Sequence, residues 1–318
     1  MILAEVIRSG FPESRHTGAV VVLGPGGQRL LSAGEVTAAA FPRSANKPMQ
    51  AAGMVRAGLG LDGKLLALAA ASHSGEAFHV SGVREILADA GLDEDALRCP
   101  PALPLDERTL QRVLREGGDA DRVHMNCSGK HAAMLATCAA ARWPVGGYLD
   151  PDHPLQQAIR RTVERLSGEQ AATVGVDGCG APLFALSLTG LARAFATMVR
   201  AEPGSAGRRV ADAMRAYPDW TSGTNRAENA LMEAVPGLLL KSGAEGVIAF
   251  ALPDGHAAAV KIEDGAARAL PAVTVALLRR LGVGSTIGAD VAALDRVASV
   301  PVLGGGRAVG HIRPILPE

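Results

Sequence analysis

The sequence has few aromatic side chains and no excess charge of either sign. Only 3% of its 318 residues are Phe, Trp or Tyr, which leaves few rings for stacking on nucleic-acid bases. Its 32 basic and 32 acidic residues cancel, so we expect neither nucleic acid nor a membrane surface as a partner. No apolar run approaches the ~18 residues of a membrane helix. The N-terminal stretch is too short and too charged for a signal peptide, so we expect a cytoplasmic protein.

Cysteine is scarce too, and four thiols in a cytosolic chain are expected to stay reduced. Cys99 and Cys138 occupy ordinary positions, and we interpret both as structural. Cys127 and Cys179 each lie near glycines at the predicted edge of a helix or strand. Two thiolates with a nitrogen ligand and water would form an open tetrahedral zinc site. The alternatives are two buried thiols, or one thiol nucleophile beside His131.

Lysine is the scarcest cation, since only five of the 32 basic residues are lysines. One of them, Lys47, follows Ser44 at the spacing Ser-x-x-Lys. If this stretch opens a helix, the two side chains lie one turn apart on the same face. A neutral lysine amine can take a proton from a serine hydroxyl, whereas arginine cannot act as a base. The alternative is a serine that caps a helix, followed by a solvated lysine.

Two further elements suggest hydrolase chemistry. Ser74 lies in a flexible turn that ends a predicted helix, where a hydroxyl can be presented. Lys241-Ser242-Gly243 follows four apolar residues of a predicted strand. Serine β-lactamases and penicillin-binding proteins use Ser-x-x-Lys, a second serine and Lys-[Ser/Thr]-Gly in this order. In them, the last element is an edge strand that can supply a backbone N–H for an oxyanion.

The order of predicted elements indicates an α+β fold with an antiparallel sheet flanked by helices and a helical subdomain. We expect a single catalytic domain over residues 1–318. Its helix-rich part spans about 44–170, and its α/β part comprises 1–43 and 171–318. Three antiparallel strands are predicted over 238–241, 246–252 and 257–263. The G-x-G-x-x-G letters at 58–63 follow a helix instead of a strand, so they predict a turn and not a nucleotide site.

Five segments together resemble the class 3 L-asparaginases, the Rhizobium etli type also called asparaginase II. The two segments that contain Cys127 and Cys179 are the most specific. The segments span most of the chain, and they are Arg43–Pro48, Ser72–Glu76, Met125–His131, Gly175–Pro182 and Lys241–Val247.

The resemblance implies a fold like that of serine β-lactamases and glutaminases, a homodimer, and hydrolysis of L-asparagine to L-aspartate and ammonia. It implies two catalytic Ser–Lys pairs, Ser44–Lys47 and Ser74–Lys241. Lys261 is the alternative partner of Ser74, but Lys241 is preferred because it lies in the Lys-Ser-Gly element.

The resemblance also implies one zinc ion per subunit, held by Cys127, Lys130, Cys179 and water. A lysine ligand must be deprotonated, and Zn²⁺ itself favours the neutral amine. We expect this zinc to assist substrate binding and not to be required for the chemistry.

Four side chains in the matching segments are candidates for substrate binding: Arg43, Glu76, His131 and Asp177. We expect Arg43 to receive the substrate carboxylate and Asp177 its ammonium group. The sequence leaves three rival functions open: a glutaminase, a β-lactamase-like or peptidase-like hydrolase, and a zinc-binding protein without enzymatic activity.

Overall fold

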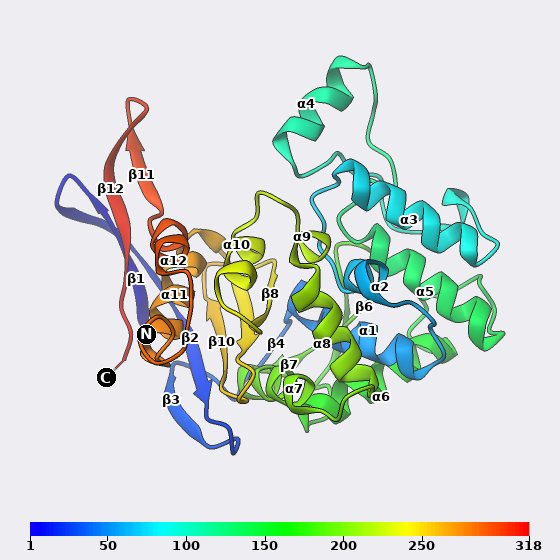
Figure 1. The fold of residues 1–318 in the computed structure, drawn as a ribbon, viewed down its shortest axis with the longest axis horizontal. Helices are drawn as coiled ribbons and strands as arrows, with labels where there is room; N and C mark the ends of the chain where they lie inside the picture. Colours follow the sequence, from blue (N-terminus) through cyan, green and yellow to red (C-terminus); the bar gives the residue numbers. More distant parts are fainter. Residues whose placement is uncertain (318) are drawn as a thin grey trace. The chain divides into compact units, whose positions relative to one another are not determined.

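A computed structural model describes residues 1–317 of the chain. Contacts divide the chain into two compact units, which we call the sheet unit and the helical unit. The sheet unit comprises Met1–Ala45, Leu186–Arg200 and Ala230–Glu318, and the helical unit comprises Asn46–Ala185 and Ala201–Asn229. Figure 1 shows the chain coloured along its sequence.

The sheet unit is built on an antiparallel sheet of eight strands, with the order β11-β12-β1-β2-β10-β9-β8 and β3 added to β2. The strands are β1 (Ile2–Arg8), β2 (Phe11–Leu23), β3 (Arg29–Ala33), β8 (Leu239–Gly243), β9 (Val247–Ala251), β10 (Ala257–Ile262), β11 (Pro301–Gly304) and β12 (Arg307–Pro314). The long strand β2 joins the two halves of the sheet, because its first half pairs with β1 and its second half pairs with β10. Strand β8 ends the order and is therefore an edge strand.

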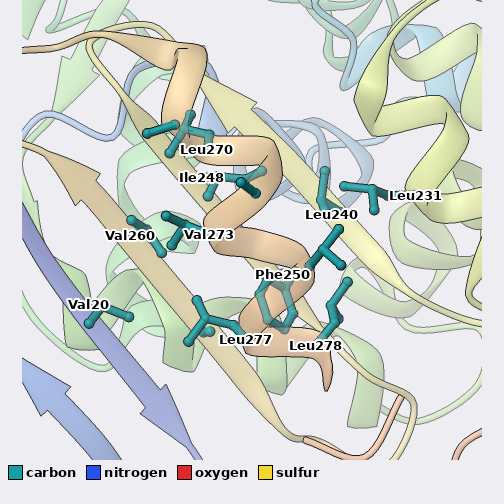
Figure 2. Close-up of a cluster of buried hydrophobic side chains, with 14 of the residues drawn as sticks. Val20, Leu231, Leu240, Ile248, Phe250, Val260, Leu270, Val273, Leu277 and Leu278 are labelled. Atoms are coloured by element: carbon teal, nitrogen blue, oxygen red, sulfur yellow. The ribbon is translucent and has the colours of Figure 1, made fainter. Parts of the chain in front are cut away.

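One face of this sheet carries the large apolar side chains. Residues of β8, β9 and β10 that alternate along each strand face helix α11 (Leu270–Arg280), which also packs near α12 (Val291–Ala298). Figure 2 shows Phe250 and Ile248 of β9 against Val273 and Leu277 of α11. Because Phe250 is fully buried there, its burial stabilises the unit by about 3 kcal/mol.

The opposite face of the same strands carries small side chains, among them Ala249 and Ala259. Helix α7 (Leu188–Arg200) packs on β2, β9 and β10. Side chains alternate between the two faces of a strand, so the alanines lie on the face away from α11. This face also carries Lys241, two residues before the end of β8.

The helical unit is organised around helix α5 (Ser128–Ala141), which is buried along most of its length. Its sequence is rich in alanine and lacks a polar face, which is typical of a helix surrounded by other elements. Lys130 and His131 sit in its first turn and are therefore buried with it. The other elements are α1 (Lys47–Arg56), α2 (Gly63–Ala69), α3 (Ala77–Asp89), α4 (Glu107–Arg115), α6 (Pro154–Ser167), α8 (Ala206–Ala216), α9 (Pro218–Thr221) and the hairpin of β5 (Val174–Val176) and β6 (Pro182–Phe184), around α5 (Ser128–Ala141).

The predicted α+β class with an antiparallel sheet is confirmed. The three antiparallel strands predicted near the Lys-Ser-Gly element correspond to β8, β9 and β10. Residues 57–62 link α1 to α2, in agreement with the predicted turn, and Gly63 is the first residue of α2. The helical unit takes in residues 171–185 and 201–229, which the sequence had placed with the α/β part. Within residues 1–317, no helix is long and apolar enough to cross a membrane.

Candidate active site

Lys47 is the first residue of helix α1 and is almost completely buried, with 1% of its surface exposed. Pro48 follows in the first turn, where a missing N–H breaks no helical hydrogen bond. The Lys47 amine makes three hydrogen bonds. Its Nζ lies 2.6 Å from the carbonyl oxygen of Ala71, 2.9 Å from Ser72 Oγ and 3.1 Å from Cys127 Sγ.

The hydroxyl that contacts the Lys47 amine is that of Ser72, a residue the sequence did not single out. Ser72 and Ser74 lie two residues apart in one non-helical stretch after α2, so the pattern alone does not separate them. None of the three hydrogen-bond partners of the amine is Ser44. The roles predicted for Ser44 and Ser74 stay predictions, and Ser72 joins them as a candidate.

His73 anchors the stretch between the two serines. Its ring is fully buried, and burial lowers its pKa well below the usual value, so the ring is neutral. Its Nδ1 accepts from the backbone N–H of Gly75 at 3.1 Å, so Nε2 carries the proton and lies 2.8 Å from Ser128 Oγ. Ser72 and Ser74 are therefore held on either side of a fixed ring.

Ser74 is itself buried, and its hydroxyl donates to Glu76 Oε1 at 2.7 Å. The same carboxylate accepts from the backbone N–H and the hydroxyl of Thr224, at 2.9 and 2.8 Å. Gly223 has a φ of +136°, and a Cβ there would lie 2.1 Å from Ser74 Oγ. Only glycine fits so close to the serine. The Ser74–Glu76 pair thus binds the turn that contains Gly223 and Thr224.

These hydrogen bonds set the charge state of Glu76. Burial alone would raise its pKa, but the bonds from Ser74 and Thr224 outweigh burial and lower the pKa below 4.5. The ionised carboxylate therefore stabilises the folded state above pH 4.5, and this contribution is lost as the pH falls through the lowered pKa.

Replacing Glu76 with glutamine is expected to reduce the free energy of unfolding at pH 7 by about 2 kcal/mol, since the acceptor loses its charge. The deficit should shrink as the pH falls from 4.5 through the lowered pKa, because the wild-type carboxylate becomes protonated over that range. Urea unfolding of the wild type and the variant at several pH values measures this deficit in the free energy of unfolding. Glu85→Gln, an exposed site on α3, is the control. A deficit that does not depend on pH would contradict the charged hydrogen bonds.

A cavity of about 370 Å³ opens beside Ser74 within the helical unit. It has side chains of both charges, and its lining comprises Ser74, Leu105, Asp106, Glu107, Arg108, Asn225 and Arg226. Asn225 Nδ2 donates to Asp106 Oδ2 at 3.3 Å across it. Burial alone would raise the pKa of Asp106, but the hydrogen bonds from Thr109 outweigh burial and lower the pKa, so the carboxylate is ionised.

The two cysteines predicted as zinc ligands lie together in the helical unit. Cys127 and Cys179 are buried, the Cys127 thiol donates to Asn126 Oδ1 at 3.1 Å, and Lys130 Nζ lies 3.1 Å from Cys179 Sγ. The neighbouring Cys127 thiol and the charge of Lys130 lower the pKa of Cys179 despite burial. The neighbouring Cys179 sulfur and burial raise the pKa of Cys127. The pKa values of the two thiols therefore shift in opposite directions.

These residues fit a zinc ion by the chemistry of their donor atoms. Two thiols and an amine lie close together, with the Lys130 amine 3.1 Å from Cys179 Sγ, and sulfur and nitrogen are the donors that zinc prefers. Burial opposes the charged form of Lys130, but the negative sulfur of Cys179 raises its pKa, so the amine is protonated until a metal displaces its proton. Within the part of the chain that the structure describes, no three His, Cys, Asp or Glu side chains form a metal-binding group.

Two of the residues predicted to bind substrate lie near this cluster. His131 is fully buried, and its Nδ1 lies 2.8 Å from the hydroxyl of Tyr148. Asp177 lies in the turn between β5 and β6, is half-buried, and accepts from the backbone N–H of Gly178 at 2.9 Å. Its Oδ2 lies 3.8 Å from Cys179 Sγ. Only Asp177 of these two is partly accessible.

The sheet unit brings two other predicted elements together. A Cβ at Gly243, the last residue of β8, would lie 2.4 Å from the carbonyl oxygen of Pro42 and 3.1 Å from the backbone nitrogen of Ser44. Arg43 and Glu245 both have φ in the left-handed region, at 50° and 60°, and form an ion pair with N–O of 3.8 Å. Non-glycine residues with such φ angles are strained and often mark functional sites.

The proposed partners of Ser74 belong to the sheet unit. Lys241 is buried in β8, and its Nζ donates to the carbonyl oxygen of Ser242 at 3.0 Å. Lys261 lies in β10 and lines a separate cavity of about 430 Å³ with Glu35 and Glu263. A pair between Ser74 and either lysine joins the two units and stays a prediction.

The sequence matches one protein family over almost its whole length. The family is described as L-asparaginase II, and the match covers residues 4–314. No curated protein matches the sequence.

Solved structures give more distant likenesses. A β-lactamase from Mycobacterium bovis is 18% identical, with 84% of this chain and 95% of that chain covered and a TM-score of 0.45. A protein called Mglu is 15% identical, with 86% of this chain and 62% of the Mglu chain covered and a TM-score of 0.46. EstCE1, a hydrolase with promiscuous acyltransferase activity, is 13% identical, with 80% of this chain and 91% of the EstCE1 chain covered and a TM-score of 0.40.

Proposed function

The chain belongs to the L-asparaginase II family and is an amidohydrolase, and from this premise we propose that it hydrolyses L-asparagine to L-aspartate and ammonia. The observation that carries the proposal is the buried amine of Lys47, 2.9 Å from the Ser72 hydroxyl. Cleavage of an amide needs an activated nucleophile, and a lysine next to a serine can supply one.

The neighbours of Lys47 can accommodate an uncharged amine. A neutral amine has two N–H bonds and one lone pair. Its N–H bonds would go to the carbonyl oxygen of Ala71 and to Cys127 Sγ, and its lone pair would face the Ser72 hydroxyl. Once the amine has lost a proton, turning the Ser72 hydroxyl is enough to keep all three hydrogen bonds.

In the proposed reaction, neutral Lys47 takes the proton of a serine hydroxyl, and the oxygen attacks the side-chain amide carbon of asparagine. Ammonia leaves, and water hydrolyses the acyl-enzyme. Ser44 and Ser72 are the candidates for the attacking hydroxyl. The pair of Ser74 with Lys241 is proposed to relay protons or to supply the attacking serine instead. Backbone N–H groups at the end of edge strand β8 would face the oxyanion.

Charged groups would hold the two ends of the amino acid. Arg43 is proposed to receive the substrate carboxylate, and Asp177 its ammonium group. Glu76 and His131 are the other residues proposed for substrate binding. Both are engaged in hydrogen bonds with the protein, so they would shape the site more than touch the substrate.

Zinc is proposed to be held by Cys127, Lys130 and Cys179. When bound, the ion would supply a Lewis acid that orients an oxygen of the substrate. The residues that would hold it are buried beside Lys47, because Cys127 Sγ lies 3.1 Å from the Lys47 amine. A homodimer stays a prediction of the resemblance.

Replacing Cys127 with alanine should remove zinc and raise KM more than it lowers kcat, if the ion orients substrate and does not do the chemistry. Elemental analysis and steady-state ammonia release measure both effects. Cys138→Ala is a matched control, because Cys138 is a buried thiol of α5 outside this cluster. A complete loss of kcat with KM unchanged would contradict the orienting role.

One coupled assay of ammonia release on L-asparagine and L-glutamine tests the function directly. A higher kcat/KM for asparagine supports the proposal, and a preference for glutamine indicates a glutaminase. Turnover of nitrocefin without ammonia release from either amide would identify a β-lactamase-like hydrolase. Bound zinc without turnover of any of these compounds would point to a protein that only binds metal.

A further inference from the structure

The cavity beside Ser74 has no role in the sequence patterns or in the proposed reaction. Its volume of about 370 Å³ lies at the small end of the range for ligand pockets, so it suits a small molecule. Its lining includes Ser74, which has 3% of its surface exposed, but neither Arg43 nor Asp177. A molecule bound there would lie beside a candidate catalytic serine and would be held by groups other than those two.

Hydrogen bonds hold two sides of this cavity in place. The backbone N–H of Asp106 donates to the carbonyl oxygen of Ser74 at 2.8 Å. Asp106 Oδ1 accepts from the backbone N–H and the hydroxyl of Thr109, both at 2.8 Å, and so caps helix α4. The segment on the other side is held through Thr224, whose backbone N–H donates to Glu76 Oε1 at 2.9 Å. The polar groups are thus positioned before a ligand arrives, which lowers the cost of binding.

Asp106 provides an acceptor with spare capacity. Its Oδ2 receives one hydrogen bond from residues 1–317, the 3.3 Å bond from Asn225 Nδ2. A carboxylate oxygen has two lone pairs, so Oδ2 can accept a second bond from a ligand. The carboxylate is ionised and partly exposed, and a positively charged donor makes the stronger, charge-assisted bond to it. An ammonium group therefore fits this side of the cavity.

Two arginines of the lining supply donors for a negative group. The guanidinium of Arg108 makes no hydrogen bond or ion pair with the residues that the structure describes. Arg226 Nε lies 3.7 Å from Glu228 Oε2, beyond hydrogen-bond distance. A guanidinium presents its N–H groups in a planar fork that matches a carboxylate. These two side chains therefore fit a carboxylate of a ligand.

The lining has a balanced charge, since Asp106 and Glu107 offset Arg108 and Arg226. Such a cavity favours a ligand that carries both charges over a simple anion or cation. We propose that the cavity beside Ser74 is a second amino-acid site, which binds a free α-amino acid with its ammonium group at Asp106 and its carboxylate at Arg108 and Arg226. That this amino acid is asparagine or aspartate rests on the proposed function.

Isothermal titration calorimetry with three probes tests the site in the full chain. The probes are L-aspartate, which the proposed reaction does not consume, succinate, which lacks the ammonium group, and β-alanine, which lacks the α-carboxylate. The wild type should bind L-aspartate about tenfold more tightly than either analogue, since each analogue leaves a charged group of the cavity unpaired. Equal affinity for L-aspartate and either analogue, or no binding of L-aspartate, would overturn the proposal.

Asp106→Asn removes the charge and keeps the helix cap, because asparagine caps helices as well as aspartate does. It should weaken one L-aspartate site per chain about tenfold and abolish the preference of that site over succinate. Arg108→Gln combined with Arg226→Gln should instead abolish the preference over β-alanine. Asp119→Asn and Arg112→Gln are the controls, because both side chains are exposed and lie outside the lining. Wild-type binding of L-aspartate by Asp106→Asn would overturn the proposal.

Asp177→Asn separates this site from the other group proposed to hold an ammonium. The variant should still bind L-aspartate more tightly than succinate, and adding Asp106→Asn should remove that difference. Loss of the difference in Asp177→Asn alone would place the ammonium group at Asp177 and overturn the proposal.

Failure of the proposed function would be a separate result. If an aspartate site that depends on Asp106 is found but no amide releases ammonia, the asparaginase proposal alone fails. If ammonia is released from asparagine but Asp106→Asn binds L-aspartate as the wild type does, the cavity proposal alone fails.

Discussion

Replacing Lys47 with methionine is expected to lower kcat for ammonia release by about 10²- to 10⁴-fold, the usual contribution of a positioned general base. Methionine is a similarly long side chain, but it cannot take a proton. Lys47→Arg should lose as much, because a guanidinium keeps the positive charge but cannot act as a base. Steady-state assays with L-asparagine measure both variants.

Lys64→Met is the control for this prediction, because Lys64 is exposed and its Nζ lies 5.2 Å from the centre of the Trp220 ring. Its turnover should equal that of the wild type. Thermal unfolding of each variant separates loss of chemistry from loss of fold. A Lys47→Met protein that is folded and turns over at the wild-type rate would remove Lys47 as the base.

Ser72→Ala is expected to reduce kcat by about 10²- to 10⁴-fold, because it removes the hydroxyl that contacts the Lys47 amine. Ser74→Ala should cost less turnover, since the Ser74 hydroxyl is bound to Glu76 and holds a turn. Comparing kcat and KM for these two variants and Ser44→Ala shows which of the three hydroxyls contributes most to turnover.

The outcome for each serine variant is distinct. A Ser44→Ala enzyme with near wild-type turnover would remove Ser44 as nucleophile and favour Ser72. Wild-type turnover in Ser72→Ala, with a large loss in Ser44→Ala, would mean that Ser72 only orients the amine. A burst of ammonia before the steady state would show that an acyl-enzyme accumulates.

The strands and helices with regular apolar spacing could be predicted from the sequence, whereas the length of β2 could not. Its first half pairs with β1 at the exposed end of the sheet, so polar residues such as Glu13 and Arg15 occupy it. Arg15 pairs with Glu5 of β1 at 3.0 Å. Such charged cross-strand pairs replace the alternation of apolar and polar residues by which strands are usually predicted.

At the candidate site, the sequence identified the residue types better than their partners. The resemblance grouped Cys127 with Cys179 although 51 residues separate them in the chain, and the structure brings them into contact. Which serine meets Lys47 depends on the path of the chain after α2, a tertiary property without a sequence signal.

Three of the five lysines are buried, namely Lys47, Lys130 and Lys241, each with 1% of its surface exposed. Amine-directed reagents used to tag or immobilise proteins therefore reach Lys64, the half-buried Lys261 and the chain's amino terminus in the folded state. Attachment to a support through amines would be confined to those few points and would leave the interior amines unmodified.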